Sequence, residues 1–142
     1  MIATVYPRVL VDTGPLIAIL DEQDAHHARC VETLNRIRPP LLTTWPVITE
    51  TAWLLRRQKP ALQRLFAGEE SGLLRVMPLG ENALTEFTKI SHRFRTLQLQ
   101  IADMSLLLLA EQQELTTIFT LDRRDFEVIR KKARRRILLL PE

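Results

Sequence analysis

Short apolar runs that alternate with helical segments are the feature that most constrains the fold of this chain. Runs rich in Val, Leu, Ile and Thr each end at residues that favour a turn or a helix start. We expect strands at residues 8–11, 41–45, 73–79 and 116–121, with a fifth at 137–140. Strands that alternate with helical segments are typical of an α/β fold with a mainly parallel sheet and helices on both faces.

Prolines and one aspartate mark the starts of several helices between these runs. Pro15, Pro46 and Pro60 suit first helical positions, and Asp24 suits an N-cap. The spacing of Cys30, Leu34 and Ile37 places them on one buried face, so we expect Cys30 in the core. The predicted helices are 15–20, 24–38, 46–57, 60–67, a segment around 84–94, 103–114 and a basic helix after residue 126.

Length and composition favour one ordinary domain. The 142 residues include 46% hydrophobic and 26% charged residues, and no linker or repeat divides them, so we expect a single domain over 1–142. The apolar runs are too short to cross a bilayer, and the first residues lack the pattern of a secretory signal. Cys30 is the only cysteine, which excludes an internal disulfide and a cysteine zinc cluster and favours the cytoplasm.

The basic residues are mainly arginine and are concentrated near the end of the chain. The net charge is +3, and 16 of the 20 basic residues are Arg, whose planar fork suits phosphate. Eight of them lie between Arg123 and Arg136. A solvated helix face and a phosphate-binding surface both explain this run.

Four acidic residues occupy positions where α/β proteins place functional groups. Asp12 follows the first predicted strand and Asp122 follows the fourth, and sites form outside the carboxyl ends of such strands. Glu50 lies near the start of the helix after the second strand, and Asp103 begins another helix. Each has a structural explanation as a turn residue, a helix cap or a first-turn acid. We expect all four to converge in one crevice.

A group of four carboxylates points to a bound cation. Like charges raise one another's pKa values unless a cation compensates them, and carboxylate oxygens suit Mg²⁺ or Mn²⁺. Such ions activate water and stabilise the oxygens of a phosphodiester. The chain has no glycine-rich phosphate loop, which argues against hydrolysis of nucleoside triphosphates. Phosphodiester hydrolysis is the simplest chemistry for carboxylates beside arginine-rich surfaces.

Four segments together resemble a known family. They are residues 9–17 (VLVDTGPLI), Thr49-Glu50, residues 101–106 (IADMSL) and residues 120–126 (TLDRRDF). In this order and at this spacing the chain resembles PIN-domain nucleases, and more narrowly the VapC toxins of toxin–antitoxin pairs.

The resemblance implies a three-layer α/β/α fold and a role for each matching residue. Asp12, Glu50, Asp103 and Asp122 match the family's catalytic quartet, which holds Mg²⁺ or Mn²⁺. Thr13, Thr120 and Asp125 match supporting positions near the metal. Family members cleave RNA, often form homodimers and are inhibited by a cognate antitoxin. We also expect Arg123 and Arg124 to neutralise the RNA backbone.

Other interpretations remain open at this point. The same fold serves nucleases with a housekeeping role on RNA or DNA, and it serves non-catalytic nucleic-acid-binding modules. A phosphoacceptor receiver domain also places acids at strand ends, but it needs paired acids near the start of the chain, and Asp12 has no acidic neighbour. Trp45 and Trp53 fit stacking on bases, packing between helices, or a surface that receives an antitoxin segment.

Overall fold

A parallel sheet of five short strands forms the centre of the molecule. The computed structural model describes residues 4–133 and 135–142. The strands pair in the order β3-β2-β1-β4-β5, and every pair is parallel. Their bounds are β1 Leu10–Val11, β2 Leu41–Thr43, β3 Leu74–Val76, β4 Thr117–Phe119 and β5 Leu138–Leu140. The prediction of a mainly parallel sheet is confirmed.

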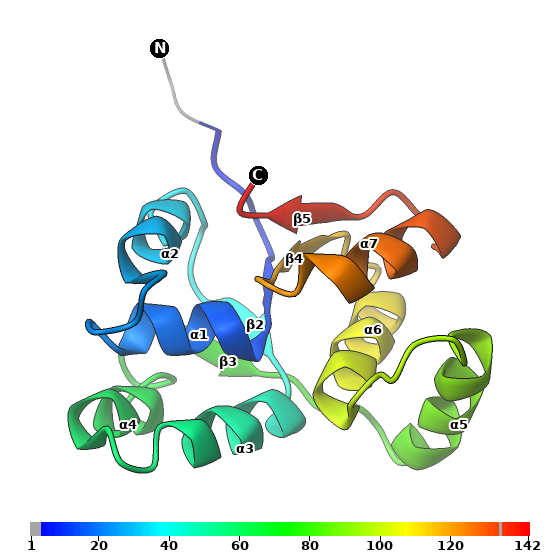
Figure 1. Cartoon of the computed structure of the whole chain (residues 1–142), viewed down its shortest axis with the longest axis horizontal. Coiled ribbons are helices and arrows are strands. Elements are labelled where there is room, and N and C mark those ends of the chain that lie inside the picture. Colours follow the sequence, from blue (N-terminus) through cyan, green and yellow to red (C-terminus); the bar gives the residue numbers. More distant parts are fainter. Residues whose placement is uncertain (1–3, 134) are drawn as a thin grey trace.

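Helices flank this sheet on two sides. Figure 1 shows α1 to α4 gathered on one side and α5 to α7 on the other. Their bounds are α1 Thr13–Leu20, α2 His27–Leu34, α3 Trp45–Leu54, α4 Lys59–Phe66, α5 Ala83–Arg93, α6 Ile101–Gln113 and α7 Arg123–Lys132. This arrangement confirms the predicted three-layer α/β/α architecture.

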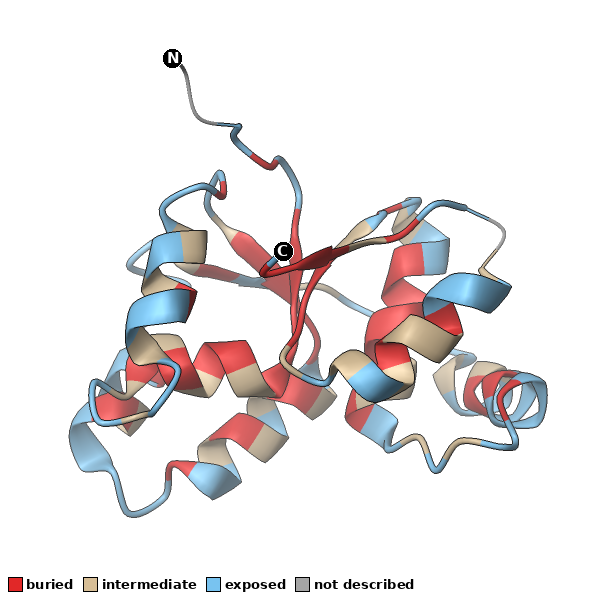
Figure 2. Cartoon of the chain, turned by 45° about the horizontal axis from the view of Figure 1, so that its top comes forward, coloured by how far each residue is buried: buried red, intermediate tan, exposed pale blue. Residues whose placement is uncertain are grey.

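The core lies between the sheet and the inner faces of the helices. Figure 2 shows the buried residues on the strands and on the helix sides that face them. Leu10 and Val11 of the central strand are fully buried, and the leucines of α6 are almost fully buried beside them. Burial of each such side chain stabilises the fold by roughly 1.5–3 kcal/mol. Cys30 is also fully buried, so its predicted place in the core is confirmed.

The strand order creates a switch point beside the central strand. From β1 the chain proceeds outward to β2 and β3, and then returns to β4 on the other side of β1. The segments that follow β1 and β4 therefore depart from neighbouring strand ends. In open α/β sheets this is the place where ligands bind.

Several predicted boundaries differ from the structure. The helix expected at 24–38 spans only His27–Leu34, because backbone bonds of Tyr6 to Arg36 and Arg38 hold the next residues in an extended bridge. The strands are shorter than predicted, and Trp45 begins α3 instead of ending β2. Helix α6 begins at Ile101, before Asp103, and α7 begins at Arg123 instead of after residue 126.

A buried pair of hydroxyl groups connects the start of α3 to α6. Thr44 caps α3, with its Oγ1 accepting from the Val47 N–H at 3.4 Å, and it lies 2.6 Å from Ser105 Oγ. The Ser105 hydroxyl donates to the Ala102 carbonyl at 2.7 Å, so the Thr44 hydroxyl donates to Ser105. Both side chains are completely buried. The pair fixes α3 against α6, the helices that carry Glu50 and Asp103.

We predict that Thr44→Val lowers the free energy of unfolding by about 1–2 kcal/mol, because it removes a helix cap and one buried hydrogen bond. Chemical denaturation measures this loss. In a double-mutant cycle with Ser105→Ala, the two losses should couple by roughly 0.5 kcal/mol or more. Strictly additive losses would show that the two hydroxyls contribute separately.

Candidate functional site

Asp12 is a buried carboxylate at the end of the central strand. It is 6% exposed and caps α1, where its Oδ1 accepts from the Thr13 N–H at 2.8 Å. Its Oδ2 accepts from the Thr120 hydroxyl at 2.9 Å. Thr120 in turn accepts from the Asp122 N–H at 3.0 Å. One side chain therefore connects the carboxylate after β1 to the turn after β4.

Three other carboxylates form a compact group at the same switch point. Each of Asp103, Asp122 and Asp125 offers an oxygen that lies within 4.8 Å of the others. Asp122 caps α7, and its Oδ1 accepts from the Asp125 N–H at 3.4 Å. Asp103 is the third residue of α6 and not its N-cap, and its Oδ2 accepts from the Gln100 N–H at 3.2 Å. The group includes Asp125, which the sequence analysis placed outside the quartet.

Glu50 lies beside this group without belonging to it. It is half-buried in the second turn of α3, so the interpretation as a first-turn residue is wrong. Its charge raises the pKa of both Asp12 and Asp103, which places it within electrostatic reach of each. Asp12 likewise lies outside the 4.8 Å group but raises the pKa of Asp103.

Burial and neighbouring negative charges oppose the ionisation of Asp12 and Asp103 by raising their pKa values. The pKa of Asp103 is raised to about 7, mainly by burial. The charges of Asp12, Asp122 and Glu50 also raise it, whereas the hydrogen bond from the Gln100 N–H lowers it. Burial also raises the pKa of Asp12, although its bonds from Thr13 and Thr120 oppose the shift. A cation would relieve this repulsion, so the donor set fits a divalent metal.

Thr13 adds a polar group without a partner. Within residues 4–133 and 135–142, its Oγ1 is the one buried side-chain nitrogen or oxygen that has no hydrogen-bond partner. Thr13 is 5% exposed and directly follows Asp12. Buried hydroxyls are normally satisfied, so an unpaired one next to a buried carboxylate fits a place where a polar ligand binds.

The two arginines predicted to contact RNA differ in their surroundings. Arg123 donates to the Pro141 carbonyl at 2.9 Å and contacts Glu127 at 3.4 Å, so it holds the end of the chain against α7. Arg124 is exposed. Sequence reasoning missed Thr44 and Ser105, although a serine within the leucine run of α6 is a usable signal for a buried polar contact.

The tryptophans do not pack between helices as one interpretation held. Trp45 and Trp53 are 63% and 64% exposed, and Leu54 and Phe66 are similarly exposed on α3 and α4. The Arg56 guanidinium lies 3.9 Å from the ring centre of Trp53, a cation–π contact. Helices α3 and α4 therefore present an apolar surface to the surroundings, which is typical of an interaction site.

The fold and the site define an α/β protein with clustered carboxylates at the switch point of a parallel sheet. A family model described as PIN domain matches residues 9–132, and the chain belongs to this family. PIN nucleases generally use a divalent metal, and the group of Asp103, Asp122 and Asp125 fits such a site. Among the described residues, no helix combines the length and the apolar character needed to span a membrane.

Comparisons with known proteins agree with this assignment. The chain is 25% identical over 138 residues to Ribonuclease VapC26 of Mycobacterium tuberculosis, covering 94% of this chain and all of that protein. Its structure resembles that of VapC20 from the same species, described as a Sarcin–Ricin loop cleaving toxin, with a TM-score of 0.74, 18% identity and coverage of 84% and 94%. It also resembles VapBC2 of Rickettsia felis bound to a promoter DNA fragment, with a TM-score of 0.63, 12% identity and coverage of 92% and 96%.

We predict that the metal-free protein loses stability as the pH rises. The pKa of Asp103 in the folded state is about 7, above its value of roughly 3.9 in the unfolded chain. Protonation therefore favours the folded state, and this contribution is complete below the unfolded pKa and is lost as the pH rises through about 7. Thermal unfolding in chelator between about pH 4 and about pH 8 measures the slope, and Mg²⁺ should restore stability at the higher pH.

The matched variants are Asp103→Asn, which should flatten this slope, and Glu81→Gln, which removes an exposed carboxylate and should leave it unchanged. An Asp103→Asn slope equal to that of the unmodified chain would contradict the prediction.

Proposed function

We propose that this chain is a divalent-metal-dependent endoribonuclease in which Asp12, Glu50, Asp103 and Asp122 hold Mg²⁺ or Mn²⁺. The observation that carries the proposal is a cluster of carboxylates at the switch point of the sheet, in which burial and neighbouring charges raise the pKa values of Asp12 and Asp103. Such an arrangement destabilises the protein unless a cation binds there. The relative named Ribonuclease VapC26 supports RNA as the substrate.

The surrounding residues orient the carboxylates. Thr120 and the Thr13 N–H each occupy one oxygen of Asp12 and fix the plane of its carboxylate. The Gln100 N–H fixes Asp103 in the same way. Asp125 supplies a further oxygen close to Asp103 and Asp122, and we assign it a role beside them at the metal. When bound, the ion supplies Lewis-acid activation of water and stabilises the charge on the phosphodiester.

We infer a biological role as the toxin of a toxin–antitoxin pair, acting as one nuclease domain in the cytoplasm, where its substrate RNA is found. The solved structures that the chain resembles include a toxin–antitoxin complex from Klebsiella pneumoniae, with a TM-score of 0.65, 16% identity and coverage of 83% and 89%. The exposed Trp53, Leu54 and Phe66 on α3 and α4 fit an apolar segment of an antitoxin. A homodimer is a further expectation.

A second candidate function is a non-catalytic nucleic-acid-binding module of the same fold, and a third is a housekeeping nuclease. Metal-dependent cleavage of RNA would distinguish the proposed enzyme from the non-catalytic binding module. Inhibition by the product of a neighbouring gene separates a toxin from a housekeeping nuclease.

We predict that the purified chain cleaves RNA with Mg²⁺ or Mn²⁺ and not with chelator, and that Asp12→Asn reduces cleavage at least about 100-fold. A panel of labelled structured and single-stranded RNAs tests this. Calorimetric titration of the metal accompanies the assay. A folded chain that neither binds a divalent ion nor cleaves any RNA would refute the enzyme and favour the binding module.

We predict that Thr120→Val lowers cleavage about 10- to 100-fold, because Asp12 loses the donor that orients it. Thr120→Ser keeps the hydroxyl and should retain most of the activity. A titration of the metal should show weaker binding for the valine variant alone. Equal activity of the valine and serine variants would show that the hydroxyl does not position Asp12.

A further inference from the structure

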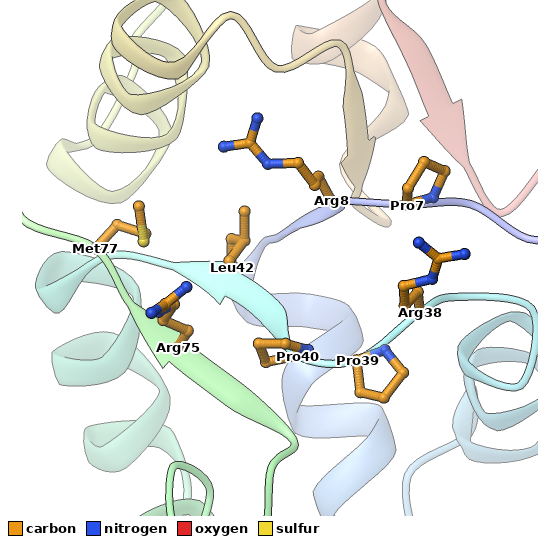
Figure 3. A pocket seen from close by; sticks show the side chains of 8 residues that line it. All are labelled: Pro7, Arg8, Arg38, Pro39, Pro40, Leu42, Arg75 and Met77. Atoms are coloured by element: carbon orange, nitrogen blue, oxygen red, sulfur yellow. The ribbon is translucent and has the colours of Figure 1, made fainter.

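A basic hollow lies on the sheet away from the carboxylates. It has a volume of about 160 Å³ and is lined by Arg8, Arg38 and Arg75 together with apolar residues that include Pro40, Leu42 and Met77. Figure 3 shows the three guanidinium groups spaced around the hollow. Arg8 precedes β1, Arg38 precedes β2 and Arg75 belongs to β3, so three separate segments supply the charges. We call this site the basic hollow.

The three arginines of the basic hollow are exposed, and no acidic side chain compensates their charges. Five other arginines each pair with a glutamate: Arg64, Arg93, Arg123, Arg130 and Arg135. In the part of the chain that the structure describes, the side chains of Arg8, Arg38 and Arg75 form no ion pair and no hydrogen bond. The lining also contains no acidic residue. Three like charges gathered without compensation favour a bound anion.

The backbone at Arg8 supports a binding role. Its φ is 51°, in the left-handed region, where residues other than glycine and asparagine are uncommon. Strained positions of this kind concentrate at binding sites, where the surrounding structure holds them. The strained backbone at Arg8 therefore agrees with a binding role for this segment.

We propose that the basic hollow binds a backbone phosphate of the RNA, as a subsite remote from the cleavage site. This inference rests on the proposed function. Arg8 and Asp12 are four residues apart, so their Cα atoms are at most ~14 Å apart, and one RNA strand can reach both. Guanidinium forks match phosphate oxygens, and the apolar wall of Pro40 and Leu42 suits the adjoining sugar. The subsite contributes to binding and not to the chemical step.

The test compares two triple variants with equal loss of charge. Arg8→Asn/Arg38→Gln/Arg75→Gln removes the hollow's charges, with asparagine chosen at position 8 because it tolerates a positive φ. The control, Arg29→Gln/Arg57→Gln/Arg95→Gln, removes three exposed charges from other surfaces. Fluorescence anisotropy follows a labelled single-stranded RNA in chelator at several salt concentrations, on an Asp12→Asn background that prevents cleavage.

We expect the hollow variant to bind the RNA at least about 10-fold more weakly, and the slope of log affinity against log salt to decrease by about 0.7, since one phosphate contact is lost. The control variant should lose about 3-fold or less. Equal weakening by the two variants would overturn the proposal, because it would show a general effect of net charge. If the chain binds an acidic peptide and binds no RNA, the proposal is also overturned, in favour of a protein partner.

Two further measurements keep the proposal separate from folding and from the nuclease function. In the unmodified chain, inorganic phosphate should shift the side-chain Nε resonances of Arg8, Arg38 and Arg75, and unshifted resonances would overturn the proposal even where the triple variant fails to fold. RNA binding in chelator does not require cleavage. The subsite can therefore be confirmed even if the chain does not cleave RNA. In the cleavage assay the hollow variant should raise KM and leave kcat unchanged, and an unchanged KM would overturn the subsite alone.

Discussion

The rest of the site depends on the two hydrogen bonds that hold the Asp12 carboxylate. One comes from the start of α1 and the other from Thr120 after β4, so a single side chain fixes both segments that leave the switch point. A buried carboxylate needs such donors, because transfer of an unpaired charge from water into the interior is very costly. The bonds leave Asp12 buried, oriented and still repelled by its acidic neighbours. That combination makes the site unstable by itself and receptive to a cation.

The remaining carboxylates follow from local helix geometry. Asp122 caps α7 and Asp103 lies in the first turn of α6, and at such positions an acid binds free backbone N–H groups and is favoured by the helix dipole. For Asp12 and Asp122 the structural explanation as a helix cap is therefore correct, and it does not compete with a functional one. Capping places the carboxylates at helix starts, and the parallel sheet brings those starts together. Mutual repulsion then follows from ordinary helix chemistry applied several times at one edge of the sheet.

The sequence predicted most of the fold and part of the candidate site. Alternating patterns identified the strands and helices, because periodicity reflects which face of each element is buried. They did not identify the strand order, since pairing depends on contacts between distant segments. The resemblance of residues 120–126 implied a supporting position near the metal for Asp125, but its place beside Asp103 depends on how α7 packs against α6 in space. The short α2 depends on Tyr6, thirty residues away in sequence, and the basic hollow depends on three segments that only the sheet brings together.

The short strands determine how the acidic and basic regions relate to each other. The carboxylates lie where the central strands end, and Arg8 and Arg38 lie where β1 and β2 begin. Each added residue in a strand would separate the two regions by about 3.3 Å. With strands of two and three residues, both regions remain within the reach of one flexible polyanion. The opposite charges also require opposite ligands, because the acidic region repels phosphate until a cation binds, whereas the basic hollow attracts phosphate directly. A substrate held first at the hollow would therefore approach the carboxylates from a fixed position. Its phosphodiester could enter the acidic region only after a cation has bound there.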